Sequence, residues 1–338
     1  MTENKNPSAN INNETINESP VSEKKIDLSV NIAGIRLKNP VIAASGTFGS
    51  GSEYSNITDV SLLGGICTKG LTMTPRTGNT GIRLWETPGG LMNSIGLENP
   101  GIPVFLERDL PKMKELGPVI IANLSGASAD EYINGAVMLN NSSVDMIELN
   151  ISCPNLKAGG MAFGLDSGTA AAITAAVRRA SRNKPLIVKL SPNAPSLSTI
   201  AIACVKAGAD ALSLVNTFKA MAIDTVSRKP VFDNIISGLS GPAIKPIALR
   251  MVWELYDALK NANTQVPIIG IGGISCTEDA LEFLMAGAAA IQVGSATFVN
   301  PHTMTGIIDG IHNYMKKTGM SGINEISIKG NYGIGAGE

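Results

Sequence analysis

Short apolar runs alternate with longer amphipathic segments through most of the chain, from about residue 28 to residue 317. A short, wholly apolar run is typical of a strand buried on both faces, and amphipathic segments between such runs predict helices that cover a parallel sheet. Eight runs follow this pattern, at Val41–Ala44, Gly65–Thr68, Val119–Ala122, Met146–Asn150, Leu186–Leu190, Ala211–Val215, Pro267–Ile271 and Ala289–Val293.

The segments between the runs predict helices near Glu53–Leu63, Pro103–Leu116, Asp130–Asn140, Thr169–Arg182, Ser196–Ala207, Ala243–Asn261, Thr277–Ala286 and Met304–Lys317. Eight strand–helix units favour an α/β fold that closes into a (β/α)8 TIM barrel. An open doubly wound sheet is the alternative. Closure suits eight similar units better, and no G-x-G-x-x-G dinucleotide fingerprint follows an early strand.

Additions to the simple barrel are also visible. Leu28–Ile32 and Ile35–Leu37 alternate about an Ala-Gly turn and predict an N-terminal β-hairpin that plugs one end. We expect excursions after strands 2, 4 and 6. Leu71–Ile95 is the first of these, and the glycine-rich segment Lys157–Gly168 after strand 4 is typical of a lid.

The ends of the chain differ in composition from the barrel. Residues 1–25 are rich in Asn, Ser and Glu and predict a disordered N-terminal tail, without the pattern of a secretory or transit peptide. The predicted division is therefore a tail over 1–25, a barrel over 26–320 and a C-terminal tail over 321–338.

Composition excludes several functional classes. The 338 residues are 44% hydrophobic with a net charge of −1, and no basic cluster predicts nucleic-acid binding. No apolar run is long enough to span a membrane. Four widely separated cysteines and two histidines argue against a disulfide framework or a metal site, and favour a cytoplasmic protein.

Polar side chains stand where the predicted strands end, the edge at which a barrel of this kind places its active site. One Asn at a strand end is more often a turn residue than a ligand group, but three Asn and two Lys at one barrel mouth reverse that preference. These polar strand-end residues are Ser45, Lys69, Asn123, Asn150, Lys189, Asn216 and Thr217.

The ends of two predicted strands contain glycine and form a candidate phosphate site. Gly272-Gly273 and Gly294-Ser295 follow strands 7 and 8, where exposed backbone N–H groups of barrels commonly bind an anion. Lys189 ends a strand of Leu, Ile and Val, where it could extend to solvent or stabilise negative charge on a ligand.

Cys153 is the candidate nucleophile or base among the cysteines. Cys67 and Cys204 lie in apolar runs and are expected to be inert, and Cys276 has no evident role. Cys153 follows strand 4 between Ser152 and the predicted lid, where a thiol can act as a base once its surroundings favour the thiolate.

Several motifs together resemble the class 1 dihydroorotate dehydrogenase family over Leu28 to about Lys317. They are A-S-G-T-F-G at Ala44–Gly49, N-S-I-G-L at Asn93–Leu97, N-I-S-C-P-N at Asn150–Asn155, K-L-S-P at Lys189–Pro192, L-S-G-P-A-I-K-P at Leu239–Pro246 and I-G-G-I at Ile271–Ile274. The resemblance implies oxidation of dihydroorotate to orotate in pyrimidine synthesis, with one FMN per subunit. Cys153 would remove the C5 proton, and FMN N5 would accept hydride from C6.

The resemblance also implies two sets of binding residues. FMN would be held by Ser45, Lys69, Gly70, Asn123, Asn150, Lys189, Val215, Gly241, Gly272, Gly273, Gly294 and Ser295. Substrate would be held by Lys69, Asn93, Ser94, Ile95, Gly96, Leu97, Asn150, Asn216 and Thr217. Planar amides suit a pyrimidine ring with alternating donors and acceptors, and Lys189 would face the flavin near N1 and the C2 carbonyl.

Within class 1, the first motif and the loop C-P-N-L-K-A-G-G-M-A-F-G are similar to the NAD-linked B type. That type implies a homodimer core and an electron-transfer partner with FAD and a 2Fe–2S cluster, in a heterotetramer of two catalytic and two electron-transfer subunits. This chain has no cysteine spacing for the cluster. Ser295 departs from the Thr common at that position, and the 1–25 tail has no recognised counterpart.

Three alternatives stay open on the sequence. The first is an A-type homodimer that passes electrons to fumarate, and the second is an FMN barrel that acts on dihydrouracil. The third, from a different class, is a non-catalytic barrel that binds a phosphorylated ligand.

Overall fold

The computed structural model describes residues 25–152 and 163–329, and its centre is a closed barrel of eight parallel strands. Hydrogen bonds join them in the order β3-β4-β7-β8-β9-β10-β15-β16, and β16 returns to β3. Their bounds are β3 Val41–Ala43, β4 Gly65–Cys67, β7 Val119–Leu124, β8 Met146–Asn150, β9 Leu186–Lys189, β10 Ala211–Leu214, β15 Ile268–Ile271 and β16 Ala290–Val293. The predicted fold class is confirmed, and all eight predicted strands are present.

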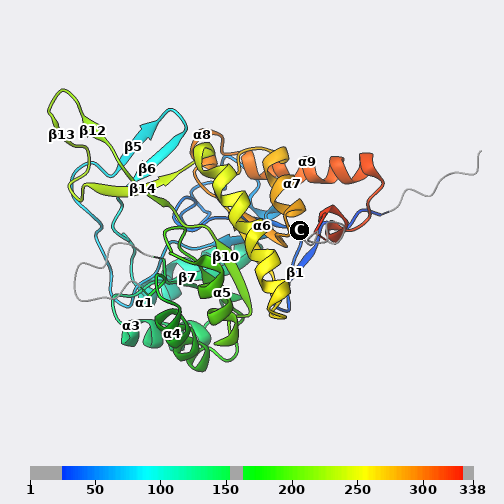
Figure 1. Cartoon of the computed structure of the whole chain (residues 1–338), viewed down its shortest axis with the longest axis horizontal. Helices are drawn as coiled ribbons and strands as arrows, with labels where there is room; N and C mark the ends of the chain where they lie inside the picture. Colours follow the sequence, from blue (N-terminus) through cyan, green and yellow to red (C-terminus); the bar gives the residue numbers. More distant parts are fainter. Residues whose placement is uncertain (1–24, 153–162, 330–338) are drawn as a thin grey trace, which may run out of the picture.

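Helices cover the outside of the barrel (Figure 1). They are α1 Ile102–Val104, the π-helix η2 Phe105–Asp109, α2 Leu110–Leu116, α3 Ala129–Asn140, α4 Ser167–Ala180, α5 Leu197–Lys206, α6 Lys245–Asn261, α7 Thr277–Met285, α8 Ala296–Val299 and α9 Thr303–Thr318, with 3-10 turns η1 Val60–Leu62, η3 Pro242–Ile244 and η4 Ile323–Ile326. Most begin and end within about two residues of the predicted bounds, because their apolar faces pack on the strands. The short helix α8 has no counterpart in the sequence prediction.

The helix predicted over Glu53–Leu63 is wrong. This segment forms turns, and only the 3-10 turn η1 is helical. Gly49 and Gly51 have positive φ, and the Asp59 side chain accepts a hydrogen bond from the Ser61 N–H, so helical structure begins only after Asp59. Short polar side chains that bind nearby backbone compete with a helix in this way.

The N-terminal hairpin forms as predicted, from β1 Val30–Ile32 and β2 Ile35–Leu37. Its residues Val30, Ile32 and Leu37 are buried and belong to the main core cluster. Asn39 then leads directly into β3, so the hairpin packs at the N-terminal end of the strands, opposite the end where the strand-end polar residues lie.

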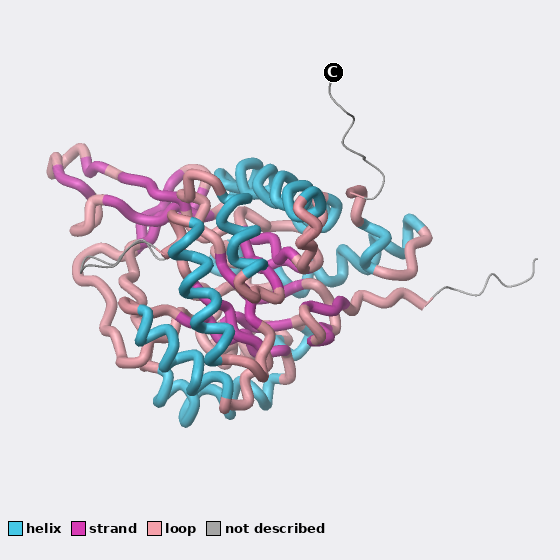
Figure 2. The backbone as a smooth tube through the Cα atoms, turned by 60° about the horizontal axis from the view of Figure 1, so that its bottom comes forward, coloured by secondary structure: helices cyan, strands magenta, loops and turns pink. Residues whose placement is uncertain are grey.

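The excursions after β4 and β10 combine into one antiparallel sheet, which we call the roof sheet. It contains β11 Phe218–Met221, β14 Ile236–Ser240, β6 Gly90–Asn93 and β5 Leu84–Thr87, hydrogen-bonded in that order. A two-stranded ribbon, β12 Ile223–Asp224 and β13 Lys229–Pro230, extends beyond it. Both views show these strands to one side of the barrel (Figure 1 and Figure 2).

The chain after the last long helix returns to the barrel. Ile323 and Ile326 of η4 are buried, and the Lys329 ammonium lies 3.4 Å from the centre of the Trp253 ring and 2.6 Å from Asp257 Oδ1. The domain division at residue 320 stays a prediction, and most of the predicted N-terminal tail lies outside the described residues. No helix in the described part of the chain is both long and apolar enough to cross a membrane.

Candidate active site

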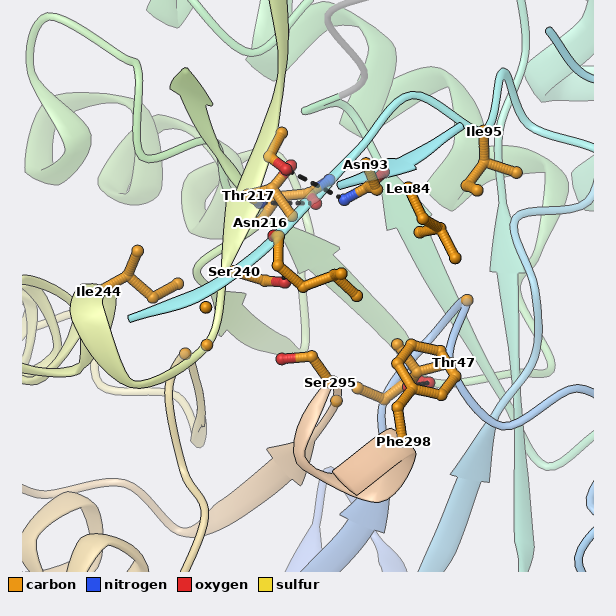
Figure 3. A pocket seen from close by; sticks show the side chains of 18 of the residues that line it. Thr47, Leu84, Asn93, Ile95, Asn216, Thr217, Ser240, Ile244, Ser295 and Phe298 are labelled. Atoms are coloured by element: carbon orange, nitrogen blue, oxygen red, sulfur yellow. Dashed lines mark hydrogen bonds between the residues drawn. The ribbon is translucent and has the colours of Figure 1, made fainter. Parts of the chain in front are cut away.

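A cavity of about 1060 Å³ lies between the C-terminal ends of the barrel strands and the roof sheet. Figure 3 shows its two sides, with Asn93, Asn216 and Thr217 on one side and Thr47, Ser295 and Phe298 on the other. The volume is at the upper end of the range for ligand pockets and leaves room for a nucleotide-sized ligand together with a smaller one. Barrels of this fold place their active sites at this end.

Nearly all of the predicted site residues line this cavity. Those at or just after the ends of barrel strands are Ser45, Lys69, Gly70, Asn150, Lys189, Val215, Asn216, Thr217, Gly272, Gly273, Gly294 and Ser295. Gly241 follows β14 of the roof sheet, and those of the N-S-I-G-L motif are Asn93, Ser94, Ile95, Gly96 and Leu97. Asn123 does not line it, because its side chain is fully buried beneath Asn150 and Gly70. Cys153 lies outside the described residues, as does most of the predicted lid.

A polar layer lies inside the barrel, directly below the cavity floor. Its four side chains come from alternate strands β4, β8, β10 and β16, which is how a barrel of this fold builds a layer of its core. Such layers are usually branched and apolar, but these side chains are all polar and at most 1% exposed: Cys67, Glu148, Ser213 and Gln292.

Glu148 is the centre of the polar layer. Its Oε2 accepts hydrogen bonds from Ser213 Oγ and Gln292 Nε2, each at 2.8 Å. Its Oε1 accepts from Asn123 Nδ2 at 2.6 Å and from Cys67 Sγ at 3.2 Å, and lies 3.6 Å from Lys189 Nζ. A buried carboxylate with this many donors and a cationic partner is stable in its ionised form.

The pKa values of the two ionisable side chains in this layer, Glu148 and Cys67, are shifted in opposite directions. Burial alone would raise the pKa of the Glu148 carboxyl, but Lys189 and the hydrogen bonds from Gln292, Ser213 and Cys67 outweigh burial and hold the pKa below its ordinary value. Burial and the neighbouring Glu148 carboxylate raise the pKa of the Cys67 thiol well above its ordinary value. Cys67 is therefore a hydrogen-bond donor and not a nucleophile.

Two of the glycines predicted to form a phosphate site are required for conformational reasons. Gly272 and Gly273 have backbone φ angles of +132° and +73°, which residues other than glycine rarely adopt. A Cβ on Gly273 would lie 2.8 Å from the Gly241 carbonyl oxygen, and one on Gly272 would lie 2.7 Å from Ala248 Cβ. The chain thus presents bare backbone to the cavity from β15 and from the segment before η3.

Gly294 has a different reason to lack a side chain. A Cβ there would meet its nearest protein atom, Ala44 Cβ, at an ordinary 3.6 Å, so the protein itself leaves room for it. Gly294 and Ser295 line the cavity at the end of β16. Bare backbone on three sides, with Lys189 at the floor, fits a phosphorylated flavin such as FMN, whose phosphate needs N–H donors and whose ring favours a nearby cation.

The side of the cavity opposite the barrel is formed by the roof sheet and by the loop that follows β6. Asn93 Nδ2 donates to the Gly238 carbonyl at 3.2 Å, which joins β6 to β14. Asn79 Nδ2 donates to Ser94 Oγ at 3.1 Å, and Gly96 has φ +79° with no space for a Cβ beside Asn79. The roof residues are therefore held in place by their own contacts.

Sequence reasoning missed Glu148, Ser213 and Gln292. A signal for Glu148 was present, because a glutamate in the middle of a strand predicted to be buried requires a partner. The identity of its partners could not be predicted, since they come from strands far apart in the chain. Within residues 25–152 and 163–329, no group of three or more His, Cys, Asp or Glu side chains is placed to hold a metal ion.

Comparison with known proteins identifies the family. The family model for dihydroorotate dehydrogenase matches residues 27–315. A protein of Petrotoga mobilis described as dihydroorotate dehydrogenase B (NAD(+)), catalytic subunit, is 56% identical over 301 residues, which are 89% of this chain and 98% of that protein. Proteins with the same description from Geotalea daltonii and Caldicellulosiruptor saccharolyticus are 51% and 50% identical over 89% of this chain and 97% and 98% of their own lengths.

A family match over most of the chain, together with relatives at these identities, is decisive for family membership. The barrel, the N-terminal hairpin and the order of the motifs are in agreement with it. This chain belongs to the dihydroorotate dehydrogenase family of oxidoreductases.

Proposed function

We propose that this chain is the catalytic subunit of a B-type, NAD-linked dihydroorotate dehydrogenase, which oxidises (S)-dihydroorotate to orotate in the cytoplasm. The observation that carries the proposal is the cavity itself, which brings the glycine backbone, Lys189 and the amides of Asn150 and Asn216 together at one barrel mouth. The description shared by the relatives supports the B type.

FMN is the proposed cofactor, with one bound per subunit. The backbone at Gly241, Gly272, Gly273, Gly294 and Ser295 would hold its phosphate, and Lys189 would lie against its ring. Ser45, Lys69, Gly70 and Val215 would contact the rest, and Asn123 and Asn150 would act from below and beside the ring. When bound, FMN supplies the acceptor for the hydride that leaves the substrate.

The substrate would lie between the flavin site and the roof sheet. Asn93, Asn150, Asn216 and Thr217 offer amide and hydroxyl groups to the ring, and Lys69 would bind the carboxylate. Ser94 to Leu97 would close the opposite side. These groups hold the ring and exclude water, which leaves the proton at C5 to a base.

Cys153 is the proposed base. The support is its place in the N-I-S-C-P-N motif, directly after Ser152, whose Oγ is 2.6 Å from Asn216 Nδ2 beside the cavity. Ser152 is 7% exposed and is hydrogen-bonded to Asn150 and Asn216, which both line the cavity. Oxidation of the CH–CH bond would then combine proton removal by the thiolate with hydride transfer from C6.

The proposed electron route requires a partner. No dinucleotide fingerprint and no cysteine spacing for an iron–sulfur cluster occur in the sequence, so FAD and a 2Fe–2S cluster would belong to a separate electron-transfer subunit. We propose a homodimer of this chain that binds two such subunits.

The test begins with the chain purified alone. We expect an FMN spectrum that dihydroorotate bleaches under anaerobic conditions, with no reduction of NAD+ until the electron-transfer subunit is added. Brisk orotate formation with fumarate and no partner would favour the A type. Bleaching by dihydrouracil and not by dihydroorotate would favour the second alternative, and a colourless protein that takes up no FMN would contradict the proposal.

A further inference from the structure

A continuous chain of hydrogen bonds connects the buried carboxylate of Glu148 to the cavity. Asn123 Nδ2 donates to Glu148 Oε1 at 2.6 Å, and Asn150 Nδ2 donates to Asn123 Oδ1 at 3.3 Å. Ser152 Oγ donates to Asn150 Oδ1 at 2.7 Å, and Asn216 Nδ2 donates to Ser152 Oγ at 2.6 Å. The four side chains that follow Glu148 in this series include two on the cavity wall, those of Asn150 and Asn216.

The direction of this chain follows from the chemistry of its first member. An ionised carboxylate can only accept hydrogen bonds, so Asn123 must present its NH2 group to Glu148. The Asn123 oxygen is then left facing Asn150, which must present its own NH2 group in turn. The Ser152 hydroxyl donates its single hydrogen to Asn150, so it can only accept from Asn216. Asn216 must therefore present its NH2 group to Ser152.

The orientation of the Asn216 amide, at the far end of the hydrogen-bond chain, is fixed as well. The Thr217 N–H donates to Asn216 Oδ1 at 2.8 Å, which occupies the Asn216 oxygen and keeps its NH2 group toward Ser152 and the cavity. Asn150 and Asn216 each use one N–H within the chain, and the second N–H is available to a ligand. Both residues consequently face the cavity as donors.

We propose that Glu148 is a positioning residue that determines ligand selectivity from inside the barrel, by fixing Asn150 and Asn216 as hydrogen-bond donors and by holding Lys189 at the cavity floor. The favoured ligand presents acceptor oxygens at both points, as the carbonyl groups of a pyrimidinedione ring do. This inference rests on the proposed function for the identity of that ring. The hydrogen-bond chain itself is independent of it.

The decisive variant is Glu148→Gln, which keeps the shape of the side chain. A glutamine offers both a donor and an acceptor, so Asn123 can turn over and the direction of the chain is no longer determined. We expect orotate to bind FMN-loaded protein about tenfold more weakly, the factor that corresponds to one charge-assisted hydrogen bond. The flavin midpoint potential should rise, because a negative charge near the ring is lost.

Ser213→Ala is the matched control. It removes a hydrogen bond to the same carboxylate at the same depth, but retains the charge and the contact with Asn123. We expect orotate affinity and the midpoint potential to stay at the wild-type values in this variant. Equal effects of Glu148→Gln and Ser213→Ala on both quantities would overturn the proposal, because Glu148 would then have a structural role only.

Two further measurements keep the test decisive. Where Glu148→Gln does not fold, Glu148→Asp withdraws the carboxylate from Asn123 while keeping its charge, and wild-type orotate affinity there would contradict the proposal. In FMN-free protein, asparagine side-chain amide resonances should change at Asn123, Asn150 and Asn216 in Glu148→Gln but not at Asn150 and Asn216 in Ser213→Ala. Unchanged resonances in Glu148→Gln would overturn the inference, whereas failure of the wild-type protein to bind FMN or orotate would overturn only the proposed function.

Discussion

Glu148 Oε1 lies 3.6 Å from Lys189 Nζ, and the two side chains are 0% and 6% exposed. Ion pairs buried to this extent are costly to break, because the remaining charge has no solvent to compensate it. The pair therefore connects the stability of the barrel to the charge at the floor of the candidate active site.

Lys189→Met tests this connection. It leaves the Glu148 carboxylate without its cationic partner, and we expect a loss of about 3–5 kcal/mol in the free energy of unfolding, together with loss of bound FMN. Urea denaturation of the FMN-free protein measures the first effect. Lys114→Met is the control, since its pair with Asp145 is about one-third exposed and should contribute at most about 1 kcal/mol. Equal losses in the two variants would show that burial of the first pair has no special cost.

Gly294→Ala tests the proposed phosphate site. The protein leaves room for the added methyl group, so we expect the FMN-free protein to keep its stability within about 0.5 kcal/mol. The methyl group would occupy space in the cavity, and we expect FMN to bind about tenfold more weakly or worse. Gly306→Ala, in α9 with no atom within 4 Å of the added Cβ, should leave FMN affinity unchanged. Normal FMN affinity in Gly294→Ala would show that the phosphate does not bind beside Gly294.

Cys153→Ala tests the proposed base. The variant should retain FMN but lose most of the flavin reduction by dihydroorotate, measured by anaerobic stopped-flow absorbance. Cys153→Ser should be slower than the wild type near neutral pH, because an unperturbed hydroxyl is a much poorer base than a thiolate. Reduction of Cys153→Ala at the wild-type rate would exclude Cys153 as the base.

Acid should destabilise the barrel through Glu148 and Asp279. Burial opposes ionisation of Asp279, but Lys245 and Ser275 hold the pKa of its carboxyl below the ordinary value, as the partners of Glu148 do for that residue. A carboxyl whose pKa is lower in the folded than in the unfolded state stabilises the protein above the unfolded pKa. That stabilisation is lost as the pH falls from the unfolded value through the folded one.

The urea midpoint should therefore fall as the pH is lowered below the ordinary values of 4.5 for Glu and 3.8 for Asp. Glu148→Gln should make this dependence shallower, because one of the contributing carboxyls is removed. Glu115→Gln, exposed on α2, removes a negative charge without removing a buried carboxylate and should leave the dependence as it is. An unchanged pH dependence in Glu148→Gln would argue against an ionised Glu148 in the folded protein.

Local patterns were sufficient to predict the barrel. The apolar runs and amphipathic helices are short-range features, and the polar residues that follow the strands converge because parallel strands end at the same edge. The predicted helix over Glu53–Leu63 failed because Asp59 and the glycines before it favour turns, an effect of side-chain hydrogen bonds on a weak periodic pattern.

Contacts between distant segments could not be predicted. The partners of Glu148 lie on β4, β7, β9, β10 and β16, and a single sequence carries no record of which polar side chains will meet inside a closed sheet. Asn123 was expected at the barrel mouth because it follows the end of a predicted strand. It lies instead one layer deeper, where its amide connects Glu148 to Asn150.

The roof sheet has a consequence for the order in which the protein can be completed. Asn93 of β6 pairs with Gly238 of β14, which follows it by 145 residues. During synthesis at cellular rates, β6 therefore has an unpaired edge for on the order of ten seconds before β14 emerges. An unpaired strand edge can recruit other chains. The roof side of the cavity therefore stays incomplete until β14 has emerged, and during that interval the open edge of β6 exposes the nascent chain to aggregation.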